Sequence, residues 1–208
     1  MTVRLAIFDC DGTLIDGQAS ICEAMETAFA AFDLPAPNRA EVRRAVGLSL
    51  PMAVRRLLPD SDAELHHALA DAYKQAFRAA RAEGRISQPL FPGTLEVLEG
   101  LRAAGWLLGV ATGMSDRGLT HCLATHDIAD LFVTLQTADR HPSKPDPSMV
   151  STALFEALIG VGVGFSTAPP PALVRPGASG AVGNPRWRFG LRGRGIGIGS
   201  CSKFSGDR

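Results

Sequence analysis

Two aspartates, Asp9 and Asp11, follow a short apolar segment near the start of the chain. In such a pair one carboxylate can attack an electrophile, while the second protonates the leaving oxygen and then activates water. Each carboxylate repels a neighbouring phosphate dianion, and a pair of like charges at ~4 Å costs about 4 kcal/mol at an effective dielectric of ~20. The pattern therefore predicts a divalent cation, and oxygen ligands with phosphate favour Mg²⁺. The alternative is a structural Asp-Gly turn whose aspartates only cap it.

Strands are predicted directly before each group of polar residues. Residues 3–8 form an apolar run that ends at the two aspartates, and residues 106–111 form a second run that ends at Thr112. A third strand is predicted over 131–135, before the loop that carries Lys144. Because ligands bind at the carboxyl ends of strands in open α/β sheets, we expect these side chains to meet at one edge.

The segments between the strands have helical periodicity. From about residue 20 to residue 83 apolar residues recur at steps of three and four, with a break at Leu34-Pro-Ala-Pro and no strand pattern. Within it and after it, helices are predicted over residues 39–46, 51–58, 62–81, 94–104, 116–126 and 148–158. The alternation predicts an α/β fold, a Rossmann-like parallel sheet core with an inserted α-helical cap. We place the core at residues 1–16 and 86–166 and the cap at 17–85.

The composition changes near residue 160. Residues 160–208 hold one acidic residue, Asp207, against seven basic ones, and 12 of the 22 glycines. Residues 160–165 could form a strand, although glycines weaken it, and we predict that the tail 167–208 is disordered. Without further strands the first strand is left with an unpaired edge. The abrupt change suggests a shift of reading frame.

Three segments resemble the motifs of the haloacid dehalogenase (HAD) superfamily, in the family's order. The first is Asp9-Cys-Asp-Gly-Thr-Leu-Ile-Asp, the second Ala-Thr112-Gly-Met-Ser and the third Lys144-Pro-Asp-Pro. Phe91-Pro-Gly and the helical insertion resemble the phosphoglycolate-phosphatase-like branch with its C1-type cap. The resemblance covers roughly residues 1–158.

The resemblance implies a role for each matching residue. Asp9 would be the nucleophile that forms an aspartyl-phosphate, and Asp11 the general acid and base. Thr112 and the amide of Gly113 would bind phosphate oxygens, and Lys144 would neutralise charge on the nucleophile and the phosphate. The Asp9 carboxylate and the Asp11 backbone carbonyl would bind Mg²⁺. The expected function is a magnesium-dependent phosphatase acting on a small phosphomonoester.

The chain departs from the family at the fourth motif, an acidic pair that completes the metal shell. No Asp or Glu occurs between Glu156 and Asp207. Loss of such ligands weakens metal sites, so we expect weak or absent phosphatase activity. One alternative is a catalytically dead remnant that binds phosphate or a partner. Another is a β-phosphoglucomutase-like phosphotransferase, although those enzymes tend to carry Arg where this chain has Leu50 after Gly47-Leu-Ser.

The overall composition bounds the partners. The 208 residues are 46% hydrophobic and 20% charged, with 21 basic and 21 acidic side chains, as in ordinary globular proteins. Neutral charge gives no reason to expect nucleic acid, and no apolar run approaches the ~18 residues of a membrane span. Four cysteines without paired spacing are typical of reduced thiols in the cytoplasm. We expect a cytoplasmic protein whose partner is a small phosphorylated metabolite; the sequence does not indicate its oligomeric state.

Overall fold

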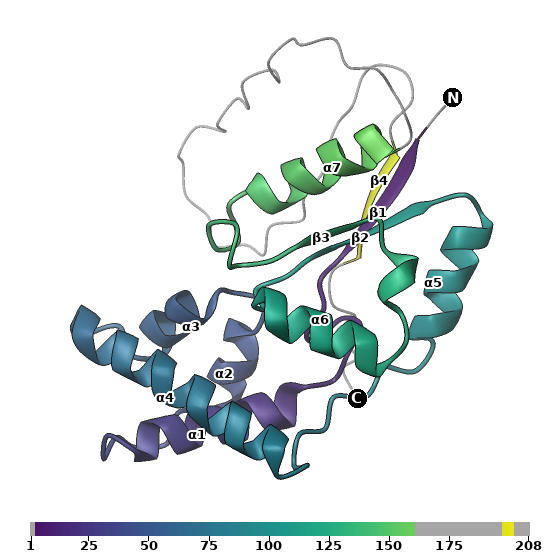
Figure 1. Cartoon of the computed structure of the whole chain (residues 1–208). Helices are drawn as coiled ribbons and strands as arrows, with labels where there is room; N and C mark the ends of the chain where they lie inside the picture. The colour runs from purple at the N-terminus through teal and green to yellow at the C-terminus, as the bar shows by residue number, and fades with distance from the viewer. Residues whose placement is uncertain (1–2, 161–196, 202–208) are drawn as a thin grey trace.

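A four-stranded parallel sheet forms the centre of the protein (Figure 1). The computed structural model describes residues 3–160 and 197–201 of the chain. The strands are β1 (Arg4–Phe8), β2 (Leu107–Ala111), β3 (Thr134–Gln136) and β4 (Gly197–Cys201). Their order is β3-β2-β1-β4, and every neighbouring pair runs parallel. The predicted α/β class with a parallel sheet is confirmed.

The two inner strands owe their stability to apolar side chains that pack on both faces of the sheet. Leu5 of β1 pairs with Leu107 of β2, and Phe8 pairs with Val110. Leu108 and Val110 are fully buried. Such continuous apolar runs are typical of parallel strands covered by helices.

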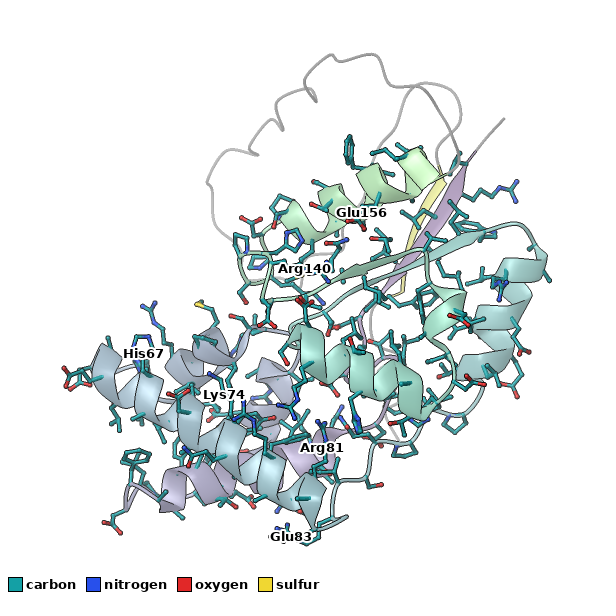
Figure 2. The ribbon with its side chains drawn as sticks, viewed as in Figure 1. His67, Lys74, Arg81, Glu83, Arg140 and Glu156 are labelled. Atoms are coloured by element: carbon teal, nitrogen blue, oxygen red, sulfur yellow. The ribbon has the colours of Figure 1, made fainter. Side chains whose placement is uncertain are left out.

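Three helices cover the sheet in two layers. Helices α5 (Thr94–Ala103) and α6 (Asp116–Thr125) lie on one face, and α7 (Ser148–Gly160) lies on the other (Figure 1). The sheet and the first two helices share one apolar core. On the opposite face, Glu156 of α7 (labelled in Figure 2) accepts hydrogen bonds from Thr134 Oγ1 at 2.6 Å and from Gln136 Nε2 at 2.7 Å. These bonds hold α7 against β3.

The four remaining helices form a separate bundle, which we call the helical module. It comprises α1 (Gln18–Ala30), α2 (Arg39–Ala45), α3 (Leu50–Leu57) and α4 (Ala63–Ala82). Its buried side chains make a second apolar cluster that includes Phe29, Val54 and Leu69. Asn38 caps α2 and Asp62 caps α4, each accepting a 2.8 Å hydrogen bond from a backbone amide of the first turn. The boundaries of 17–85 for a cap domain stay a prediction.

Two segments differ from the predicted elements. The third strand begins at Thr134 rather than at residue 131, because Ala129–Leu131 forms a short 3₁₀ turn. The strand β4 lies inside the predicted disordered tail and pairs with β1, which therefore lacks the expected unpaired edge. Its Gly-rich sequence carries no strand periodicity, so only the pairing reveals it.

The other predictions for the C-terminal part, including the disorder of 167–196 and 202–208, concern residues outside the described ranges. The strand predicted over 160–165 begins at Gly160, which is the last residue of α7, and its other residues also lie outside those ranges. Within those ranges, no helix is both long enough and apolar enough to cross a membrane.

We expect Leu108→Ala to lower the free energy of unfolding by about 2–5 kcal/mol, because it leaves a cavity in the middle of the sheet. Urea unfolding followed by circular dichroism measures this change. Leu95→Ala is the matched control, since Leu95 on α5 is 41% exposed. Equal losses in the two variants would contradict the placement of the core.

Candidate active site

The carboxyl edge of β1 and the loop before α7 bring two charged residues together. Asp9 follows the last residue of β1, and Lys144 Nζ lies 2.9 Å from Asp9 Oδ2. The other Asp9 oxygen, Oδ1, accepts a 2.8 Å hydrogen bond from the amide of Cys10. Both carboxylate oxygens are thus held at the sheet edge, with the side chain of Asp9 24% exposed. This geometry presents a fixed, ion-paired carboxylate to the space above the edge.

The carboxyl group of Asp11 is buried beside Asp9. Its Oδ1 atom is inaccessible and has no hydrogen-bond partner. Burial and the charge of Asp9 raise the pKa of Asp11 to about 7. The backbone turns sharply after it, with Gly12 at φ +76°. A carboxyl group that keeps its proton to near neutral pH is suited to donating that proton to a leaving oxygen.

Thr112 and Gly113 occupy the carboxyl end of the neighbouring strand β2. Thr112 is 1% exposed, and its Oγ1 accepts a 3.3 Å hydrogen bond from the amide of Met114. Ser115 caps the following helix α6 by accepting a 3.1 Å bond from the amide of Gly118. A threonine hydroxyl next to a helix N-terminus is a suitable environment for phosphate oxygens.

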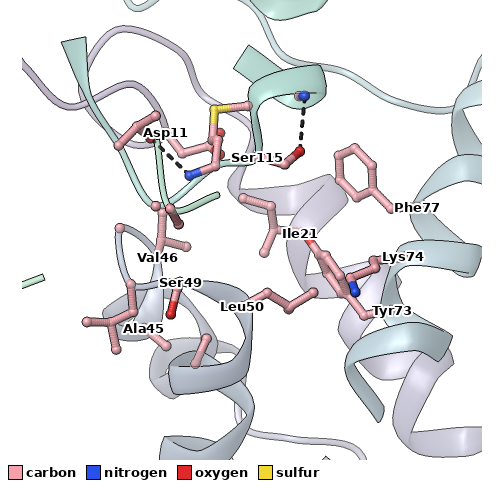
Figure 3. Close-up of a pocket in the computed structure, with 18 of the residues that line it drawn as sticks. Asp11, Ile21, Ala45, Val46, Ser49, Leu50, Tyr73, Lys74, Phe77 and Ser115 are labelled. Carbon is pink, nitrogen blue, oxygen red and sulfur yellow. Dashed lines mark hydrogen bonds between the residues drawn. The ribbon is translucent and has the colours of Figure 1, made fainter. Parts of the chain in front are cut away.

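A cavity of about 1050 Å³ lies between the helical module and this edge of the sheet. Asp11, Thr112 and Gly113 line the side of the core. Helix α4 contributes Tyr73 and Phe77 to the opposite wall, which Figure 3 shows across the cavity from Asp11. The cavity is large enough for a small organic phosphate, since ligand pockets commonly measure about 300–1,000 Å³.

The loop between α2 and α3 closes over the site and requires glycine at two points. A Cβ atom on Gly113 would collide with the backbone carbonyl oxygens of Gly47 and Leu48. Gly47 itself has φ +97°, and a Cβ there would lie 3.0 Å from Asp9 Oδ2. The amide of Ser49 donates a 2.8 Å hydrogen bond to Ser143 Oγ. The helical module is therefore held directly against the carboxyl edge of the sheet.

The thiol of Cys10, between the two aspartates, packs in the core. Its side chain is fully buried, and its Sγ lies 3.9 Å from Cys122 Sγ. The hydrogen bond with Cys122 and burial raise the pKa of Cys10 far above its usual value. A thiol that stays protonated is a poor nucleophile, as expected for a packing residue.

The oxygen atoms of Asp9 and Asp11 are suitable ligands for a hard divalent cation. Asp9 offers carboxylate oxygens, and Asp11 offers the buried, unpartnered Oδ1 as well as its backbone carbonyl. Mg²⁺ binds through one or two carboxylates and keeps several waters. Within the described residues no group of three or more His, Cys, Asp or Glu side chains could hold a metal ion. A cation here would therefore depend on water and phosphate for its remaining ligands.

The structure brings the predicted site residues to one edge, Lys144 by a direct ion pair with Asp9 and the others around the cavity. Sequence reasoning missed the polar residues Tyr73 and Arg81 of the opposite wall, and Gln88, which lines the cavity near Asp11. The spacing of four residues between Tyr73, Phe77 and Arg81 was the available signal, because it puts them on one face of α4.

We expect Gly113→Ala to push the 47–49 loop away from the sheet edge, because its Cβ meets backbone that cannot rotate aside. The amide of Ser49 should then exchange hydrogen about 10-fold faster, as loss of its hydrogen bond predicts. Hydrogen exchange with mass spectrometry measures this. Gly100→Ala is the control, since a Cβ there meets nothing within 4 Å. Unchanged exchange at residue 49 would contradict the close contact.

Comparisons with known proteins identify relatives of this chain. A curated phosphoglycolate phosphatase of Vibrio cholerae is 28% identical over 165 residues, covering 74% of this chain and 70% of the relative. One from Pseudomonas syringae pv. tomato is 30% identical over 163 residues, covering 77% and 58%. The matched part of the chain thus spans 58% to 70% of the length of these two relatives.

Solved structures share the fold. A hydrolase from Pseudomonas syringae superposes with a TM-score of 0.62 at 23% identity, covering 76% of this chain and 71% of the other. A haloacid dehalogenase-like family hydrolase from Streptococcus pneumoniae gives 0.61 at 19% identity, covering 77% and 71%. The sequence profile of the haloacid dehalogenase-like hydrolases matches residues 6–159, which include all three motif segments. The chain therefore belongs to the haloacid dehalogenase-like hydrolase family.

Proposed function

We propose that the protein is a magnesium-dependent phosphatase that hydrolyses a small phosphomonoester through an aspartyl-phosphate on Asp9. The observation that carries the proposal is the ion pair of 2.9 Å between Lys144 Nζ and Asp9 Oδ2, next to the buried carboxyl group of Asp11. The names of the curated relatives, phosphoglycolate phosphatases, support a small organic phosphate as substrate.

The first step transfers the phosphoryl group to the protein. The Asp9 carboxylate attacks phosphorus, and the bond from phosphorus to the leaving oxygen breaks. Asp11 donates its proton to that oxygen, so the product leaves as an alcohol. The Thr112 hydroxyl and the Gly113 amide hold the phosphoryl oxygens, and Lys144 offsets negative charge at Asp9. The Asp9 carboxylate and the Asp11 backbone carbonyl would hold Mg²⁺, which would supply further charge neutralisation when bound.

The second step regenerates the carboxylate. Asp11, now ionised, accepts a proton from water, and the water oxygen attacks phosphorus of the acyl-phosphate. The bond between phosphorus and the Asp9 oxygen breaks, which releases inorganic phosphate. The helical module acts as a cap that keeps bulk water from the acyl-phosphate, because its 47–49 loop lies against Gly113 and Asp9.

Turnover should be slow. No Asp or Glu lies between Glu156 and Asp207, so the chain lacks the acidic pair that the resemblance places in the metal shell. The same absence favours a second candidate function, phosphate binding without turnover.

We expect Asp9→Asn to reduce release of nitrophenolate from p-nitrophenyl phosphate with Mg²⁺ to the uncatalysed background, because an amide cannot act as the nucleophile. Asp130→Asn, a substitution of an exposed acid away from the cavity, is the control and should keep the wild-type rate. Turnover that survives in Asp9→Asn would refute the proposal. A wild-type chain that binds phosphate but never turns over would favour the second candidate.

Asp11→Asn should separate the two steps. Nitrophenolate leaves without a proton, so the first step survives, whereas activation of water is lost and steady-state turnover falls about 10²–10⁴-fold. Rapid mixing should then show a stoichiometric burst of nitrophenolate and a phosphorylated protein by mass spectrometry. A loss of burst and turnover together would argue against Asp11 as the base of the second step.

A further inference from the structure

Arg81, near the end of α4, carries a charge that no side chain of the described residues neutralises. Its Nε atom is inaccessible and lacks a hydrogen-bond partner. The guanidinium lies over the ring of Phe77, with Cζ 5.2 Å from the ring centre. By contrast, Lys74 on the same helix is paired with Asp71 at 2.9 Å. Leaving a buried donor unsatisfied costs about 1–3 kcal/mol, so an arrangement of this kind suggests a missing partner.

Arg81 lines the main cavity. Tyr73, Phe77 and Arg81 are four residues apart and therefore share one face of α4, the face that lines the cavity. Arg81 also lines a smaller adjoining cavity of about 460 Å³ with Gln88 and Cys122. Figure 2 shows Arg81 between α4 and the core helices.

Two observations place polar groups of the cavity near Asp11. A Cβ atom on Gly17 would lie 3.0 Å from both Asp11 Oδ1 and Gln88 Nε2, so these two polar atoms flank the same point. Burial raises the pKa of the Tyr73 hydroxyl well above its ordinary value, the charge of Asp11 adds to this, and the charge of Arg81 opposes it. Tyr73 is therefore within electrostatic reach of both groups.

The position of Asp11 fixes which part of the substrate reaches this wall. A general acid must contact the leaving oxygen, so the organic part of the substrate extends beyond Asp11, toward Gln88 and Arg81. The lining of the cavity also favours an anion there. Its acidic side chains are Asp11 and Asp139, against four basic ones: Lys74, Arg78, Arg81 and Arg117.

We propose that Arg81 is the specificity-determining residue of the helical module and binds a carboxylate on the leaving group of the substrate. This inference rests on the proposed phosphatase function and deepens it. The planar fork of the guanidinium matches a carboxylate in two parallel hydrogen bonds. The ring of Phe77 holds the side chain in place, which reduces the entropy lost on binding.

The test compares two substrates that differ only at the proposed contact. Phosphoglycolate carries a carboxylate where ethyl phosphate carries a methyl group. In Arg81→Met we expect kcat/KM for phosphoglycolate to fall about 10-fold or more, as loss of a charged hydrogen bond predicts, while that for ethyl phosphate stays within about twofold. Arg81→Lys should recover part of the loss. Arg55→Met, on the exposed side of α3, is the matched control and should change neither substrate.

The contact can also be tested if turnover is slow, because binding is measurable without catalysis. Calorimetry with 3-phosphonopropionate and propylphosphonate, in the presence of Mg²⁺, repeats the same comparison without catalysis. Arg81→Met should weaken binding of 3-phosphonopropionate about 10-fold or more and leave binding of propylphosphonate unchanged. The variant should unfold at the same midpoint as the wild type, which shows that its fold is intact. An equal effect on both compounds, or none on either, overturns the role of Arg81. The proposed phosphatase function fails separately, through phosphate release that is insensitive to Asp9→Asn.

Discussion

The arrangement depends on holding two carboxyl groups next to each other at the edge of a parallel sheet. Lys144 neutralises Asp9 through a 2.9 Å ion pair, and burial keeps Asp11 protonated to about pH 7. Without the raised pKa of Asp11, two carboxylates would be charged in a partly desolvated site, where their repulsion costs several kcal/mol. Without Lys144, Asp9 would lack its counter-ion. Together the two effects give the carboxyl groups the different environments that the proposed nucleophile and acid require.

The helical module completes the site by close contact. The 47–49 loop approaches Asp9 and Gly113 so closely that side chains are excluded at two positions. In the same arrangement α4 forms the far wall of the cavity, where Tyr73 and Arg81 lie across from Asp11. The proposed division places the reaction chemistry at the sheet edge and substrate recognition on the helical module, which packs on its own apolar cluster.

The C-terminal segment, where the structure describes it, contributes a strand to the sheet but no acidic side chains to the site. Strand β4 pairs with β1 through backbone groups, which a glycine-rich sequence supplies as well as any other. A metal shell needs carboxylates at fixed positions, and this stretch has none between Glu156 and Asp207. The sheet can therefore gain its fourth strand while the site lacks the acidic pair expected from the resemblance.

The sequence by itself determined most of the elements and indicated the candidate reacting groups. Apolar runs before Asp9 and Thr112 predicted two strands to within a residue or two, because burial on both faces leaves a strong local pattern. The sequence did not reveal β4, because this strand is recognised only by its pairing with β1, about 190 residues away in the chain. Nor could it show that Lys144 reaches Asp9 or that Arg81 lines the cavity, since these contacts depend on how the loops and the helical module pack. Local patterns encode which side chains are buried, whereas distances between segments far apart in the chain are decided by the tertiary structure.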